Sequence, residues 1–262
     1  MRTSFFKVLV PVAFAVVAIA AVSSASTARK STVVVHGNTT GAQPLKAKCK
    51  GSQQAISGGF ESPRHGSPVF PLANGPIGGK TWATRIDAGA ESVSISSYAY
   101  CSAGDVTTRE QTFEPTAFSR KKVSVKCPQG KQVVSGGWLT PTDQTSVVVD
   151  SSYRDGKRTW SLKAISQEEG GKLTAFALCQ KQGVKTRAKS GEIGGSGSHR
   201  TGYLTAKCKG GEKIVSGGFK LPQDVNQGGP FLLRDLKKGK SAWQIGVYFY
   251  KPGTTHVYAY CR

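Results

Sequence analysis

Apolar and polar residues alternate along three segments of the chain, and each segment leads into a cysteine. In the first segment, Leu45, Ala47 and Cys49 alternate with lysines, and the segments around Cys127 and Cys208 follow the same pattern. The lysines at the polar positions are Lys46, Lys48, Lys50, Lys122, Lys126, Lys207 and Lys209. A period of two predicts a half-buried strand, with its apolar face toward the core and its lysine face toward solvent.

A second strand follows each of these cysteines and carries two adjacent glycines, in the sequences AISGGF, VVSGGW and IVSGGF. Glycines weaken the interior of a strand unless a bulge or a closely approaching backbone needs the space. We therefore expect a bulge or a close backbone approach at Gly58, Gly136, Gly217 and the glycine after each of them, and an axis where the units meet is one such place. A phosphate-binding loop is not expected, because no helix pattern follows the glycines.

Both strands belong to an internal repeat that occurs three times, at residues 48–60, 126–138 and 207–219. Each copy is followed by a tryptophan (Trp82, Trp160 or Trp243) and then by a closing cysteine. A fixed period of this kind indicates a repeat architecture. We place the three units, of about 80 residues each, at residues 26–105, 106–183 and 184–262.

The units predict an all-β protein, because they contain short strand patterns with glycine-rich turns and no long amphipathic helix. Each unit offers four or five strands, and it opens with a β-branched segment that is either a first strand or a linker. Two arrangements fit: a single prism-like globule around a pseudo-threefold axis, or three small β-sandwiches in tandem. We favour the single globule, because the connections between units are short and contain strand-like residues.

The six cysteines predict one disulfide bond in each unit. By count alone, six cysteines allow fifteen pairings. The repeat reduces them to one set: Cys49–Cys101, Cys127–Cys179 and Cys208–Cys261. Metal binding by these cysteines is not expected, because the chain has no CxxC motif and no histidine recurs at a matching place.

The first 25 residues have the pattern of a secretory signal peptide. The basic residues Arg2 and Lys7 precede an apolar run at residues 8–22, and the small residues Ser23, Ser24 and Ala25 follow it. The run is short for a membrane span, and no second run follows it. We expect an extracellular protein, either free or associated with the cell wall, whose mature chain has no transmembrane segment. The alternative is an uncleaved anchor.

The formal net charge is +21 at pH 7, and two of these charges belong to the leader. An excess of this size often reflects an anionic partner. We expect a secreted, non-catalytic protein that binds anionic polymers, such as teichoic acid, acidic polysaccharide or extracellular nucleic acid. The seven lysines named above would supply the contacts. Alternatively, these lysines protect exposed sheet edges from pairing with other strands, or the charge serves solubility alone.

Two other function classes remain open at this stage. A lectin-like module for neutral glycans would use the loops around Trp82, Trp160 and Trp243 together with Asp143 and Asp224. The default interpretation of the three tryptophans is instead that they anchor the core, one in each unit. The third class is a protein-binding or structural matrix component that uses its loops as the contact surface.

No enzymatic activity and no cofactor are expected. His36, His65, His199 and His256 occupy non-equivalent places in the repeats. The sequence contains no HExxH, GxSxG or P-loop motif. The pair Glu168-Glu169 lies in a glycine-rich loop and is interpreted as solvated rather than as an acid pair.

The repeated pattern K-C-x-x-G-x-x-V-x-S-G-G-[FW], followed by a tryptophan and the ending Y-A-Y-C, resembles repeats of secreted bacterial proteins with no assigned activity. More distantly, the threefold repeat, with one cysteine before a glycine-bearing strand and one at the end of the unit, is similar to the vitelline membrane outer layer proteins. That resemblance implies a β-prism fold and an extracellular, carbohydrate-associated role. It covers all three units and carries over no binding residues.

Overall fold

The computed structural model describes residues 30–39, 43–62, 69–87, 93–143, 146–193, 200–222, 231–249 and 252–262. The predicted signal peptide, His65, His199 and Asp224 lie outside these ranges. The described residues form 18 β-strands and no helix, which confirms the all-β prediction. Within these ranges, no long apolar helix that could cross a membrane is present.

Each unit contributes six strands in the same order. The first unit contains β1 (Ser31–Thr39), β2 (Leu45–Lys48), β3 (Gln54–Glu61), β4 (Phe70–Ile77), β5 (Thr81–Asp87) and β6 (Val93–Ser102). The second contains β7 (Thr107–Phe113), β8 (Lys121–Lys126), β9 (Gln132–Leu139), β10 (Val147–Arg154), β11 (Thr159–Ser166) and β12 (Leu173–Gln180). The third contains β13 (Lys185–Ile193), β14 (Arg200–Lys207), β15 (Ile214–Lys220), β16 (Phe231–Lys238), β17 (Ala242–Phe249) and β18 (Gly253–Cys261).

The expected number of four or five strands per unit was too low. The opening segment of each unit is a strand and not a linker, as β1, β7 and β13 show. Strands β7 and β13 are exposed along most of their length. They therefore lack the alternation of buried and exposed residues that identifies a half-buried strand in a sequence.

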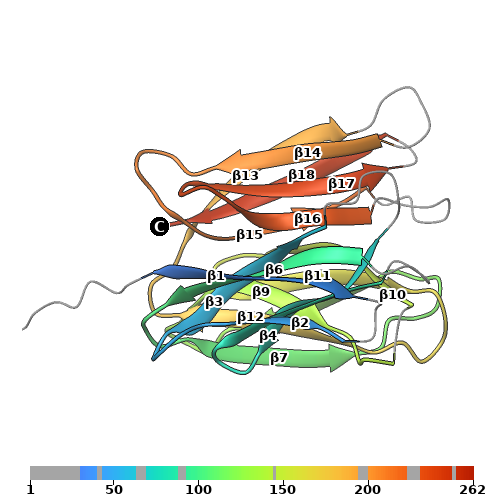
Figure 1. Ribbon diagram of the computed structural model, residues 1–262, viewed down its shortest axis with the longest axis horizontal. Coiled ribbons are helices and arrows are strands. Elements are labelled where there is room, and N and C mark those ends of the chain that lie inside the picture. Colours follow the sequence, from blue (N-terminus) through green and yellow to red (C-terminus); the bar gives the residue numbers. More distant parts are fainter. Residues whose placement is uncertain are drawn as a thin grey trace, which may run out of the picture.

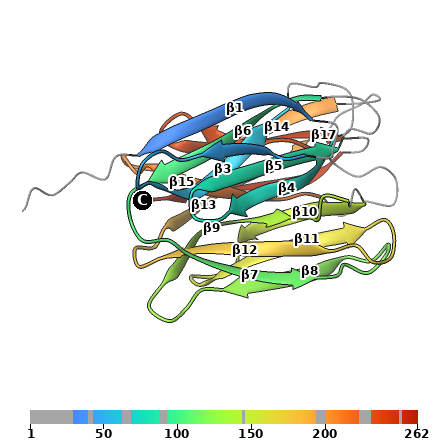
Figure 2. The same ribbon diagram turned by 60° about the horizontal axis from the view of Figure 1, so that its bottom comes forward.

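The strands form three six-stranded sheets, and each sheet combines two units. We call them sheet A (β1-β6-β3-β16-β17-β14), sheet B (β2-β5-β4-β9-β12-β7) and sheet C (β13-β18-β15-β10-β11-β8). Buried residues of all three sheets form one continuous core, around which the strands pack in Figures 1 and 2. The units are therefore interlocked in a single prism-like globule, and separate tandem sandwiches are excluded.

The second glycine of each GG pair lies at the junction between two units. Strand β3 pairs with β16, β9 with β4, and β15 with β10, through only two residue pairs each. A Cβ atom on Gly59, Gly137 or Gly218 would overlap a backbone carbonyl oxygen of the facing strand. The close backbone approach predicted from the sequence is therefore present where the units meet.

The first glycine of each pair makes room for the tryptophan of its own unit. A Cβ atom on Gly58, Gly136 or Gly217 would overlap the indole ring of Trp82, Trp160 or Trp243, respectively. Each tryptophan lies in a different sheet from the glycine that it covers. The glycine and tryptophan together set the close packing of adjacent sheets.

The three tryptophans are core residues, each 1% exposed. Their indole N–H groups donate to three equivalent polar residues: Trp82 to Asn74 Oδ1 (2.7 Å), Trp160 to Ser152 Oγ (3.1 Å) and Trp243 to Asp235 Oδ1 (2.6 Å). Asn74 Nδ2 also donates to Asp235 Oδ2 (2.9 Å), which links the first and third units. Because no ring face is open to a sugar, the interpretation of these tryptophans as glycan-stacking residues is corrected.

The three disulfide bonds are Cys49–Cys101, Cys127–Cys179 and Cys208–Cys261, as the repeat predicts. Each joins the residue after an edge strand (β2, β8 or β14) to the C-terminal end of the strand next to an edge of a neighbouring sheet (β6, β12 or β18). The Cα–Cα distance is 5.7 Å in each bond. Such bonds form and persist in oxidising compartments, so they are consistent with a secreted or extracellular protein.

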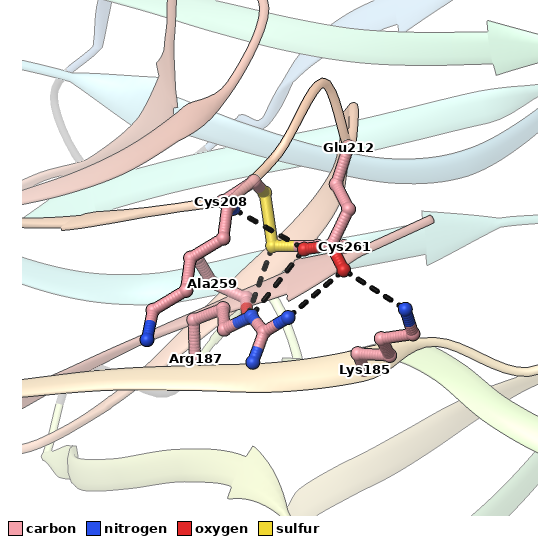
Figure 3. Close-up of a disulfide and its surroundings, with 7 residues drawn as sticks. Lys185, Arg187, Cys208, Glu212, Ala259 and Cys261 are labelled. Atoms are coloured by element: carbon pink, nitrogen blue, oxygen red, sulfur yellow. Dashed lines mark hydrogen bonds and ion pairs between the residues drawn. A yellow bond between two sulfur atoms is a disulfide. The ribbon is translucent and has the colours of Figure 1, made fainter.

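Figure 3 shows the third disulfide with its charged surroundings. Arg187 Nη2 and Lys185 Nζ lie 2.9 and 3.1 Å from Glu212 Oε1. These donors, Arg187 foremost, lower the pKa of the Glu212 carboxyl to about 2. The single carboxylate of Glu212 therefore pairs with two basic residues of β13 and compensates one of their two charges.

Candidate polyanion-binding face

A row of basic side chains crosses the outer face of sheet C. The strand registers place one residue of each strand side by side, in the order Lys122, Lys163, Ser151, Lys220, His256 and Ser190. Neighbouring strands are about 4.8 Å apart, so the six residues extend over about 24 Å and the part from Lys122 to His256 over about 19 Å. We call Lys122, Lys163, Lys220 and His256 the cationic row.

The middle of the cationic row forms a surface depression of about 380 Å³. Lys163, Lys220 and His256 line it together with Ser151, Thr254 and Pro222. Lys163, Lys220 and His256 are half-buried residues that line the depression. A charged depression can enclose part of a ligand that a flat lysine surface would leave in solvent.

The lysines of the row influence one another. Burial lowers the pKa of Lys220, and the charges of Lys163 and Lys122 lower it further, against the opposing effect of Asp155. The Lys220 ammonium lies 3.9 Å from the ring centroid of Tyr153, a cation–π contact. Like charges on facing strands repel, and this repulsion would be relieved by a bound anion.

Asp155 is the carboxylate associated with this row. Its Oδ2 accepts a hydrogen bond from Lys122 Nζ (2.7 Å), which raises the pKa of Lys122 and lowers that of Asp155. Among the residues that the structure describes, no carboxylate forms an ion pair with Lys163, Lys220 or His256. Lys163 and Lys220 therefore keep their charges without a direct carboxylate partner in the described part of the chain, although the charge of Asp155 acts on Lys220.

The corresponding position of sheet B holds Arg85, which follows Trp82 as Lys163 follows Trp160. Arg85 is 1% exposed, and its guanidinium donates to the carbonyl oxygens of Thr142 (2.7 Å) and Thr140 (3.3 Å). Burial lowers the pKa of Arg85, and Asp87 and Asp143 oppose this effect. This cation is therefore engaged by backbone acceptors inside the protein.

The corresponding row of sheet A contains Arg234, Glu61 and His36. Arg234 forms an ion pair with Glu61 and donates to Gln244 Oε1 (2.7 Å). His36 Nδ1 is hydrogen-bonded to Ser96 Oγ (2.7 Å). Three sheets of the same architecture therefore differ in charge, and sheet C alone carries the cationic row among the described residues.

No protein-family model matches this chain, and no curated protein matches it either. The assignment of a function therefore depends on the geometry of the site itself.

The seven lysines predicted from the sequence are all exposed, but they do not form one surface. Their strands, β2, β8 and β14, are edge strands of sheets B, C and A, respectively. Lys46 and Lys48 lie on β2, Lys122 and Lys126 on β8, Lys207 on β14, and Lys50 and Lys209 in the turns that follow. This placement agrees with the alternative that these lysines protect sheet edges. Lys122 is the member of the set that also belongs to the cationic row.

The remaining predicted residues do not gather into a site. Asp143 is exposed in the turn after β9, and Asp224 lies outside the described residues. Sequence reasoning missed Lys163, Lys220 and His256. Lys163 lies three residues after Trp160, and Lys220 comes directly after Phe219. Only strand register brings these two lysines together with His256. In the described ranges, His, Cys, Asp and Glu form no group of three or more suited to a metal ion.

Proposed function

We propose that this chain is a secreted, non-catalytic protein that binds an anionic polymer of the cell envelope or its surroundings through the cationic row. The observation that carries the proposal is the row on sheet C, where Lys163, Lys220 and His256 lack a carboxylate partner among the described residues. The leader pattern and the disulfide bonds support an extracellular setting. Teichoic acid, acidic polysaccharide and extracellular nucleic acid are the candidate polymers.

The mechanism is charge neutralisation. A polymer lying across the strands of sheet C would meet the basic side chains from Lys122 to His256 along about 19 Å. Binding would release condensed counterions from the polymer, so affinity falls as the salt concentration rises. The depression between Lys163 and Lys220 would hold one part of the polymer and give the row a preferred position.

The double variant Lys163→Glu/Lys220→Glu is expected to bind anionic polymers at least about tenfold more weakly than the wild-type protein, because it replaces two attractive charges by repulsive ones. Binding would be measured on bacterial cell walls with and without their phosphate polymers, over a salt series. The matched control is Lys46→Glu/Lys48→Glu, which changes the net charge equally but lies on the edge of sheet B.

The control variant should retain most of the wild-type affinity, and wild-type binding should decline with salt. An equal loss in both double variants would show that only net charge matters, and it would contradict the assignment to sheet C. Unchanged binding in Lys163→Glu/Lys220→Glu, or wild-type binding that withstands salt, would contradict the proposal as a whole.

A further inference from the structure

A small cavity lies where β1 and β6 of the first unit meet β15 and β16 of the third. Its volume is about 100 Å³, and its polar lining comes from Lys30, Ser31, Thr32, Tyr100 and Lys237. It shares no residue with the cationic row. The cavity is much smaller than the depression on sheet C, and it has room for a few water molecules or one small ion rather than for a polymer segment.

The corresponding place in sheet C is filled by an arginine. Lys237 faces Trp243 in the strand register, and Arg154 faces Trp160 in the same way. The Arg154 guanidinium donates to the carbonyl oxygen of Val184 (3.1 Å) and to Thr186 Oγ1 (3.2 Å). In sheet B the equivalent residue is Pro76, which brings no charge. This position therefore differs among the three sheets. It holds the Arg154 guanidinium in sheet C, the uncharged Pro76 in sheet B, and Lys237 beside an open cavity in sheet A.

The cavity beside Lys237 is also lined by a second basic residue, Lys30. Lys30 occupies the position that Val184 has in the third unit, directly before the strand residue that pairs with the closing cysteine. Burial lowers the pKa of Lys237, and the charge of Lys30 lowers it further. Burial also lowers the pKa of Lys30, as do Arg262 and Lys213. The described residues provide no carboxylate in an ion pair with Lys30 or Lys237.

Tyr100 adds a neutral donor to the same cavity. Its hydroxyl oxygen accepts a hydrogen bond from the backbone N–H of Lys237 (2.8 Å). Burial raises the pKa of Tyr100 well above its usual value, so the hydroxyl keeps its proton. Lys30, Lys237 and Tyr100 therefore line one space that holds one small ion, and an oxyanion is the ligand that two ammonium groups and a phenol O–H match.

We propose that this cavity binds a single phosphate or sulfate group through Lys30, Lys237 and Tyr100. The tetrahedral group offers enough oxygen atoms to accept hydrogen bonds from all three side chains, and its charge would relieve the repulsion between the two lysines. The site is separate from the proposed polymer-binding face and does not depend on it. These donors would bind free phosphate or sulfate, and equally such a group at the end of a larger ligand.

The test is a titration of the purified protein with inorganic phosphate and, separately, with sulfate, at constant ionic strength maintained with chloride. The reporter is the NMR signal of the Lys237 backbone amide, because this amide donates to the Tyr100 oxygen. We expect a saturable shift with at least one of the two anions. Comparison of the two titrations shows which group the cavity prefers.

The deciding variant is Lys237→Arg, which keeps the charge. By analogy with Arg154, the new guanidinium should reach the carbonyl oxygen of Lys30 and the hydroxyl of Thr32 and should fill the cavity. Affinity for the anion should fall at least about tenfold. Lys238→Arg, the same change at the exposed neighbouring residue, should leave affinity unchanged, and thermal unfolding of both variants would verify that they fold.

Two results would overturn the inference: no saturable shift in the wild-type protein with either anion, or wild-type affinity in Lys237→Arg. The Lys163→Glu/Lys220→Glu variant should retain the shift at Lys237. If that variant loses the polymer but keeps the shift, both proposals stand. If the wild-type protein binds the polymer and shows no shift, this inference alone fails.

Discussion

Replacing Gly217 with alanine is expected to destabilise the protein by about 3 kcal/mol. The new Cβ atom would overlap the indole ring of Trp243. This ring is 1% exposed, and its N–H donates to Asp235 Oδ1 at 2.6 Å, so it cannot move without breaking a buried hydrogen bond. Urea unfolding followed by far-ultraviolet circular dichroism would measure the change in the free energy of unfolding.

The matched control is Gly79→Ala. Gly79 lies in the turn between β4 and β5, and a Cβ atom there would meet nothing within 4 Å. Its free energy of unfolding should stay within about 0.5 kcal/mol of the wild-type value. If Gly217→Ala were as stable as Gly79→Ala, the glycines of the repeat would not be required for packing between the sheets.

The stability of the protein should decrease as the pH rises from about 4 to about 7, through the buried carboxyl of Asp235. Burial raises the pKa of Asp235 to about 7, although the hydrogen bonds from Trp243 and Asn74 oppose the shift. In the unfolded chain an aspartate has a pKa of about 3.9. The folded state therefore holds the proton more tightly, which favours folding at low pH. The difference corresponds to about 4 kcal/mol, lost in full above pH 7.

Asp235→Ser tests this expectation, because Ser152 occupies the equivalent place in the second unit and accepts the indole N–H of Trp160. The variant loses the titrating group, so its stability should change less between pH 4.5 and pH 8 than that of the wild-type protein. The difference between the two pH dependences is the readout, since the substitution also removes the partner of Asn74. Identical pH dependences would show that Asp235 does not titrate in this range.

The repeat was sufficient to predict the disulfide pairing, because each pair belongs to one unit and recurs with it. It also predicted why the glycines are needed, since two adjacent glycines in a strand require a close neighbour. The exposure of the seven predicted lysines followed from the period of two. The period of two did not predict which residues of other strands lie beside each lysine. Lys122 has Lys163 beside it, whereas Lys46 lies on the edge of a different sheet.

The sequence pattern did not identify the opening strand of each unit with certainty. Strands β1, β7 and β13 each occupy an edge of a sheet, and β7 and β13 are exposed along most of their length, so hydrogen bonding to one partner rather than burial of a face defines them. The tryptophans show the opposite case. One tryptophan at a fixed place in each unit predicted a core residue, and burial of Trp82, Trp160 and Trp243 agrees with that prediction.

The sequence alone therefore determined the strand-rich class, the three units, the disulfide bonds and the residues that face solvent, because periodicity and repetition are properties of short segments. Only the tertiary structure decided that each sheet joins strands of two units and that the basic residues of sheet C form one row. The row joins residues from Lys122 to His256, and hydrogen-bond register between strands that are distant in the chain aligns them. The tertiary structure also decided which cations have internal partners. Arg85 and Arg154 donate to acceptors of other segments, whereas Lys163 and Lys237 line open space, because that outcome depends on which acceptors the neighbouring strands and loops contribute.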